Sequence, residues 1–214
     1  MNKNNNNTIE NFYSDLEIDV SQFFPNVPEE YQIKEKSDSK SMNILLLGSY
    51  RPRISKLIGM YEKGHPKPNE KLKDGKSLFP SERMVMVKKV LEQLGHKIML
   101  GDRDGRDIRN VWNRLTYLMK KADHIVVLLN NQGGVLVEHA IITEKGYSNK
   151  THNYFKEGGR LSRLLYQGSF FLPQTKIIFY KNDRNLADLI IRATETYQTN
   201  YYKNHKKWKM EKLK

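Results

Sequence analysis

The sequence contains no cysteine among its 214 residues. Disulfide bonds and thiol chemistry are therefore excluded, and a protein of the reducing cytoplasm is expected. No apolar run approaches the roughly 18 residues that a membrane-spanning helix needs, and the Asn-rich first segment does not resemble a signal peptide. We therefore expect a soluble cytoplasmic protein that has no membrane partner.

Several motifs of common nucleotide and metal sites are also absent. No G-x-x-x-x-G-K-[ST] segment occurs, so a P-loop nucleotide site is not expected. The paired glycines Gly133 and Gly134 lack the G-x-G-x-x-G frame of a dinucleotide-binding fold. The six histidines show no spacing typical of metal ligands. We therefore predict no metal ion and no other cofactor.

Acidic residues become scarce after residue 41. The chain has a net charge of +13, yet residues 1–41 hold four lysines against eight acids, a net charge of −4 that leaves +17 on the remainder. A domain this basic attracts anions, which include nucleotides, nucleic acid and acidic surfaces. Composition does not choose among these partners.

The length suits one domain with an extension on each side. Residues 1–41 begin with the low-complexity run MNKNNNN and predict a polar N-terminal arm. We favour partial docking of this arm on the body of the protein, with disorder or docking on a partner as alternatives. Residues 201–214 hold six lysines against one acid and predict a lysine-rich C-terminal tail. This tail is either solvated or, through Trp208 and its tyrosines, suited to stack on bases or to dock on a partner.

Between these extensions, residues 42–200 alternate short apolar runs with amphipathic segments. The runs predict buried strands, and each is followed by a helix with apolar residues at steps of three and four. The predicted strands are 43–49, 97–100, 124–129 and 175–180. Such alternation predicts an α/β fold, namely a Rossmann-like or flavodoxin-like parallel sheet with helices on both faces.

Two stretches depart from this regular pattern. Residues 64–80 are rich in lysine, proline and glycine and predict a mobile loop over the sheet edge. Residues 147–174 are polar and aromatic and predict an insertion, within which 160–167 is expected to form a short helix. An insertion at this place is either a lid or an oligomer contact.

The first candidate site segment follows the first predicted strand. That strand runs into Gly48 and Ser49, and Arg51 and Arg53 come directly afterwards. Guanidinium groups beside backbone N–H groups suit a phosphate. The alternative is that both arginines are solvated loop charges of a basic protein.

The second candidate segment follows the third predicted strand. Residues 130–134, Asn-Asn-Gln-Gly-Gly, are turn formers, and glycines can take positive φ and approach a ligand closely. A helix is predicted from Val135, which places Glu138 in its first turn at the carboxyl edge of the sheet, where ligands bind in open α/β folds. The alternative is that Glu138 only complements the helix dipole.

Together these segments resemble the nucleoside 2-deoxyribosyltransferase superfamily, and most closely its branch of 2′-deoxynucleoside 5′-phosphate N-hydrolases. The resemblance covers residues 42–197 apart from the insertion, and the family pattern has an aspartate and a serine where Leu115 and Asp188 stand here. The matching motifs are a G-S-x-R loop at Gly48-Ser49-Tyr50-Arg51, the pair Ala122-Asp123 before the third strand, and a G-x-x-x-E turn formed by Gly134 and Glu138.

The resemblance implies cleavage or transfer of an N-glycosidic bond in a nucleoside or nucleotide. Glu138 would be the catalytic carboxylate, acting on C1′ of the sugar as it becomes cationic, and we expect Arg51 to lie within its reach across a cleft. The resemblance also implies a homodimer or higher oligomer. The substrate-binding residues that it implies are Gly48, Ser49, Arg51, Asn130, Gln132, Gly133 and Gly134.

Two other functions stay open on the sequence. In the first, the chain is a TIR-like or nucleotide-sensor domain that binds or cleaves NAD or a signalling nucleotide. In the second, it is a non-catalytic module that binds nucleic acid through its lysine-rich tail, which predicts binding that weakens steeply with salt.

Overall fold

The computed structural model describes residues 16–24, 41–49, 53–101, 103–105, 107–129, 133–159 and 176–211. Its strands form one sheet in which all neighbours run parallel, in the order β2-β1-β3-β4-β5. The predicted α/β fold with a parallel sheet is thereby confirmed. The strands are β1 (Asn43–Leu47), β2 (Lys97–Leu100), β3 (His124–Leu128), β4 (Thr151–Lys156) and β5 (Lys176–Tyr180).

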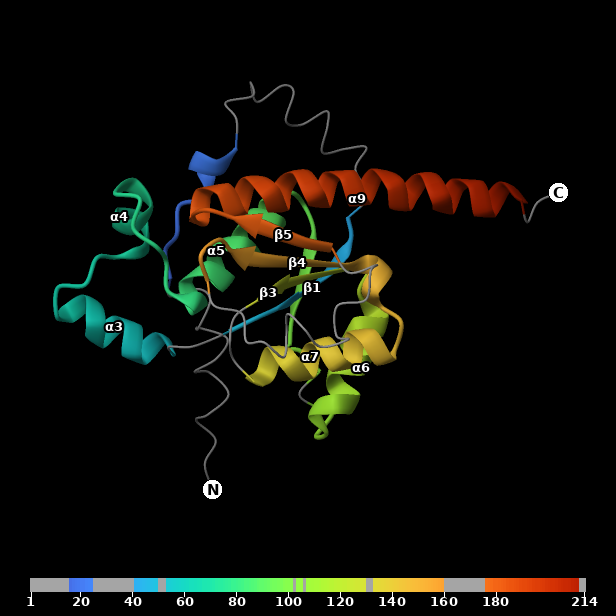
Figure 1. Ribbon diagram of the computed structural model, residues 1–214, viewed down its shortest axis with the longest axis horizontal. Helices are drawn as coiled ribbons and strands as arrows, with labels where there is room; N and C mark the ends of the chain where they lie inside the picture. The colour runs from blue at the N-terminus through green and yellow to red at the C-terminus, as the bar shows by residue number, and fades with distance from the viewer. Residues whose placement is uncertain are drawn as a thin grey trace.

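Helices cover both faces of the sheet, as Figure 1 shows. The core between the sheet and α5 and α9 receives the even-numbered side chains of β1, and the core beneath α6 and α7 receives the odd-numbered ones. Each buried leucine contributes roughly 1.5–3 kcal/mol, so these two layers supply most of the stabilisation. The helices are η1 (Ser21–Phe23), α3 (Ile54–Glu62), α4 (Pro68–Lys73), α5 (Pro80–Gln93), α6 (Val111–Lys121), α7 (Gly133–Glu144), η2 (Ser148–Lys150) and α9 (Asp183–Glu211).

One sheet strand lies where the sequence predicts an insertion. Residues 151–156 form β4, between β3 and β5. Its sequence, THNYFK, carries polar residues that are nevertheless buried, because Thr151, Asn153 and Tyr154 are all at most 1% exposed. A parallel strand that is buried on both faces is normally apolar. Because the sequence of β4 is largely polar, it does not predict a buried strand. The short helix predicted over 160–167 lies outside the described residues.

The segment predicted as a mobile loop over 64–80 instead contains α4 and a buried anchor. Pro68 opens α4, and the carboxylate of Glu70 accepts the Lys67 N–H at 2.9 Å. Lys71 is 3% exposed, and its Nζ lies 2.9 Å from both carboxylate oxygens of the fully buried Glu82 on α5. The prediction of a loop is therefore wrong for α4. A lysine-rich sequence indicates an exposed segment, and it does not show that one of its lysines, Lys71, is buried and paired.

Partial docking of the N-terminal arm is observed for residues 16–24. Leu16, Ile18 and Val20 alternate with exposed residues and enter the core shared by α5 and α9. Phe23 and Phe24 pack partly against the same core. Docking therefore uses the aliphatic residues at least as much as the aromatic ones.

The closing helix is longer than the sequence analysis expects. Its apolar spacing suggests an end near residue 200, yet α9 continues to Glu211 over 29 residues. At about 1.5 Å per residue this corresponds to roughly 43 Å. Figure 1 shows that its distal part projects beyond the sheet.

Candidate functional site

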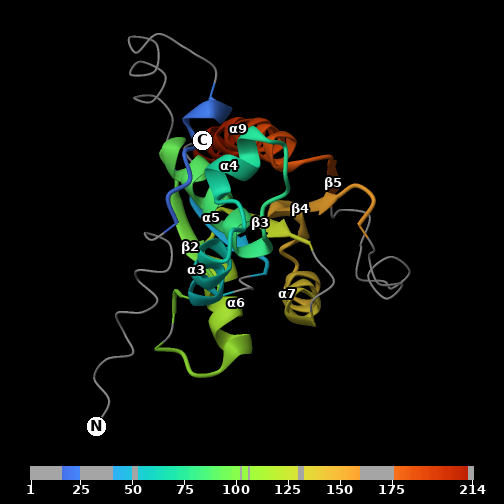
Figure 2. The same ribbon diagram turned by 90° about the vertical axis from the view of Figure 1, so that its left-hand side faces the viewer.

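The sheet has one topological switch point. From β1 the chain moves to β2 on one side and then crosses back to β3 on the other, so the connections leaving β1 and β3 diverge. In open α/β sheets ligands bind at the carboxyl ends of such a strand pair. Figure 2 faces this edge and shows α3 and α4 on one side of it and α7 on the other. The two candidate segments predicted from the sequence follow these two strands.

Gly48, at the end of β1, lies where a side chain cannot be accommodated. Its φ is +154°, and an added Cβ would lie 2.8 Å from Sδ of Met84 and 3.1 Å from Cβ of Leu128, so a side chain there would require its neighbours to shift. The glycine therefore lets β1, β3 and α5 meet closely at this edge, with or without a ligand. Ser49 follows it and is 5% exposed.

Glu138 lies deeper in its helix than the sequence predicts. The helix α7 begins at Gly133, two residues before the predicted Val135, so Glu138 falls in the second turn and the prediction of a first-turn glutamate is wrong. Gly133 and Gly134 accordingly belong to the helix and not to the turn before it. Because the dipole effect falls off within the first turn, a dipole role explains Glu138 less well. Its side chain is buried, at 9% exposure.

His139, the residue after Glu138, belongs to a polar pair that the sequence analysis misses. His139 on α7 and Asn153 on β4 are both fully buried between the helix layer and the sheet. Burial lowers the pKa of His139 to about 4, and the neighbouring Asn153 amide opposes this shift. His139 is therefore neutral near pH 7. The sequence offered one signal for this pair, namely that Asn153 lies in a six-residue segment that ends in two aromatic residues and a lysine. Such a segment is hard to distinguish from a loop.

Three of the predicted site residues lie outside the described residues, namely Arg51, Asn130 and Gln132. The expected proximity of Arg51 and Glu138 consequently stays a prediction. Arg53 is exposed and stands at the N-cap of α3.

Leu115 and Asp188 stand where the pattern of the resembled family has an aspartate and a serine. Leu115 belongs to the core between α6 and the sheet. Asp188 is a half-exposed residue of α9, where its carboxylate accepts from Nε of Arg192 at 3.0 Å.

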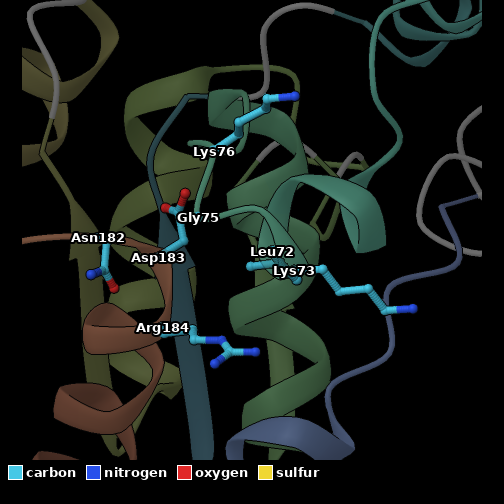
Figure 3. A pocket seen from close by; sticks show the side chains of 7 residues that line it. All are labelled: Leu72, Lys73, Gly75, Lys76, Asn182, Asp183 and Arg184. Carbon is cyan, nitrogen blue, oxygen red and sulfur yellow. The ribbon is translucent and has the colours of Figure 1, made fainter.

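A separate hollow of about 130 Å³ lies at the beginning of α9 (Figure 3). Its basic lining suggests an anion site, but the side chains of Lys73 and Lys76 extend in different directions in Figure 3. The carboxylate of Asp183 also lines the hollow, where it accepts from Nε of Arg83 and from the Leu78 N–H. A carboxylate at this point disfavours an anion, so the switch point remains the better candidate.

Within the described ranges, no group of three or more His, Cys, Asp or Glu side chains is arranged to hold a metal ion. No helix in that part of the chain is long and apolar enough to cross a bilayer. Comparisons with protein family models, with curated proteins and with solved structures found no match to the chain.

Proposed function

We propose that the protein cleaves or transfers the N-glycosidic bond of a nucleoside or nucleotide at the switch point between β1 and β3. The observation that carries this proposal is the placement of Glu138, a buried carboxylate in the second turn of the helix that follows β3. The charge of +17 outside the first 41 residues favours an anionic substrate such as a nucleotide.

In this reaction Glu138 supplies the negative charge that the sugar needs as the C1′–N bond breaks. The bonding electrons leave with the base, and C1′ becomes cationic and bonds to, or is stabilised by, the carboxylate. Water or an acceptor base then attacks C1′ and restores the free carboxylate. The resemblance assigns phosphate binding to Arg51 beside Ser49, and sugar or base binding to Asn130 and Gln132.

The test is base release from a panel of nucleosides and nucleotides that includes NAD, followed by chromatography. The wild type should release a base, and Glu138→Gln should lower turnover by several orders of magnitude, as removal of an essential nucleophile does. Glu144→Gln is the matched control, because Glu144 is an exposed residue at the end of the same helix and pairs with Lys145. Equal release by wild type and Glu138→Gln would remove Glu138 from the mechanism.

The same panel separates the alternatives. Release of nicotinamide from NAD would favour the TIR-like reading over a nucleoside substrate. No release from any compound would favour a binding module. Light scattering at high protein concentration tests the expected homodimer, which a monomer mass would contradict.

A second candidate function, nucleic-acid binding, is favoured by the length of α9. The helix carries its backbone without interruption to Glu211, through a stretch in which Lys203, Lys206, Lys207 and Lys209 occur. Cations on one projecting helix suit a phosphate backbone, and such binding weakens steeply with salt. Deletion of residues 203–214 should abolish it. Retention of salt-sensitive binding by the deleted protein would contradict this role for α9.

A further inference from the structure

A second polar cluster lies at the opposite, amino edge of the sheet, where it joins α9 to β3 and β4. We call His124, His152 and Tyr197 the amino-edge cluster. The ring centroids of His124 and Tyr197 are 4.3 Å apart, those of the two histidines 4.8 Å, and those of His152 and Tyr197 5.9 Å. All three pairs meet edge to face, so each ring contacts the other two.

Asp123, which precedes β3, ties the same part of α9 to the sheet. The hydroxyl of Tyr197 donates to the Asp123 carbonyl at 2.8 Å, and that of Tyr201 donates to Asp123 Oδ1 at 3.1 Å. The other carboxylate oxygen accepts the Asn43 N–H at 2.8 Å. The middle of α9 is thus held by ring contacts and two hydroxyl groups, immediately before its lysine-rich part.

A positive charge on His124 would be unfavourable in this cluster. His124 is fully buried, and within the described part of the chain neither of its ring nitrogens has a hydrogen-bond partner. A protonated imidazole there would bury two N–H donors without acceptors, which is costly. Burial, followed by the charges of His152 and His96, lowers the pKa of His124 well below its usual range.

The charged groups around the cluster do not relieve this cost. The Asp123 carboxylate is already engaged by Asn43 and Tyr201. Lys150 of η2 donates to the Ala122 carbonyl at 2.7 Å, and its charge acts on Asp123. His96, before β2, adds a third titratable imidazole. Proton uptake by the cluster therefore opposes the packing of α9.

We propose that the amino-edge cluster is an acid-sensitive latch, which holds the middle of α9 against the sheet while His124 is neutral and releases it when His124 is protonated. This inference does not rest on the proposed glycosidase activity. Its consequence is control over how the lysine-rich end of α9 is presented.

The sign and size of the response follow from linkage. Once released, a histidine recovers its ordinary pKa near 6.5, so release becomes more favourable as the pH falls through this value. One pH unit below it, at pH 5.5, each histidine that stays neutral in the latched state favours release about 10-fold. Between pH 7.5 and pH 5.5 we therefore expect about a 10-fold rise in the release constant from His124.

The test is amide hydrogen exchange of the full chain at both pH values, corrected for the intrinsic exchange rate. Protection of residues 195–202 should fall about 10-fold at pH 5.5 and should stay below the protection of α5 at both pH values, because release of the latch needs less free energy than global unfolding. The variant His124→Phe keeps a ring of similar shape that cannot be protonated, so it should retain its protection at pH 5.5. His65→Phe is the control, because His65 is exposed and its loss should leave the response unchanged.

Three results would overturn the latch. The first is unchanged protection of residues 195–202 at pH 5.5. The second is protection of residues 195–202 that equals the protection of α5 at both pH values, which would show that they exchange only through global unfolding. The third is a full acid response in His124→Phe. If that variant does not fold, His124→Leu takes its place and must likewise retain its protection at pH 5.5.

Discussion

The buried ion pair between Lys71 and Glu82 gives the most quantitative test of this structure. The side chains are 4% and 0% exposed, and the ammonium also lies 3.4 Å from the centre of the Phe79 ring. Substitution of Lys71→Met keeps most of the side-chain volume and removes only the charge and its hydrogen bonds. The change therefore leaves a carboxylate buried opposite a thioether.

The expected loss of stability follows from what remains around Glu82. Breaking one side of a buried ion pair costs about 3–5 kcal/mol, because the other charge stays buried. The carboxylate would still accept the Phe79 N–H at 2.5 Å and the Tyr61 hydroxyl. Because these two donors still stabilise the carboxylate, we expect the free energy of unfolding to fall by about 3 kcal/mol, at the lower end of this range. A double variant with Glu82→Gln removes the stranded charge and should recover all but about 1 kcal/mol.

The assay is urea denaturation at pH 7, with the midpoint compared among the three variants and wild type. Lys76→Met is the control, since Lys76 and its partner Asp74 are 59% and 57% exposed. Such an exposed pair contributes less than about 1 kcal/mol. A Lys71→Met protein within 1 kcal/mol of wild type would refute the reasoning. So would a double variant that is as unstable as the single one.

Three further perturbations are expected to alter the free energy of unfolding, namely two glycine substitutions of opposite effect and the protonation of His139. Gly48→Ala should lower the free energy of unfolding by about 2–4 kcal/mol, because of the φ of +154° and the 2.8 Å approach of an added Cβ to Met84. Gly59 lies within α3, and a Cβ added there would meet no atom within 4 Å. Gly59→Ala should therefore stabilise the protein by up to about 1 kcal/mol in the same denaturation assay. Burial lowers the pKa of His139 to about 4, below the pKa of about 6.5 that it has in the unfolded chain. The free energy of unfolding should therefore be unaffected by this group above pH 6.5 and should fall by about 1.4 kcal/mol per pH unit as the pH drops toward 4. A midpoint that is flat from pH 7 to pH 4.5, or a His139→Gln variant with the wild-type slope, would contradict this.

The regular part of the fold was predictable because its signals are local. The apolar runs that become β1, β2 and β3 are short and bounded by turns, and their alternation with amphipathic helices requires a parallel sheet. By contrast, β4 is a strand only because its neighbours pair with it on both sides. Tyr154 and Asn153 then become buried by tertiary packing that no local pattern reports.

The candidate site was predictable in position but not in detail. Gly48 and Glu138 were predicted to follow two strands at the carboxyl edge of the sheet, and in the structure they follow β1 and β3. The prediction that Glu138 lies in the first turn of α7 was wrong, because helix boundaries depend on interactions that propensity does not encode. Lys71 and His139 were missed because sequence position does not show which polar residues become buried.

Docking of the arm has a consequence for the order in which the chain becomes stable during synthesis. Arg184, near the start of α9, donates to the Gln22 side chain at 2.9 Å across 162 positions of the sequence. Leu16, Ile18 and Val20 therefore leave the ribosome long before the helix that helps to cover them. At roughly 5–20 residues per second the delay is roughly 8 to 30 s. For that time the three apolar side chains lack the cover that α9 provides, and a chaperone has access to them.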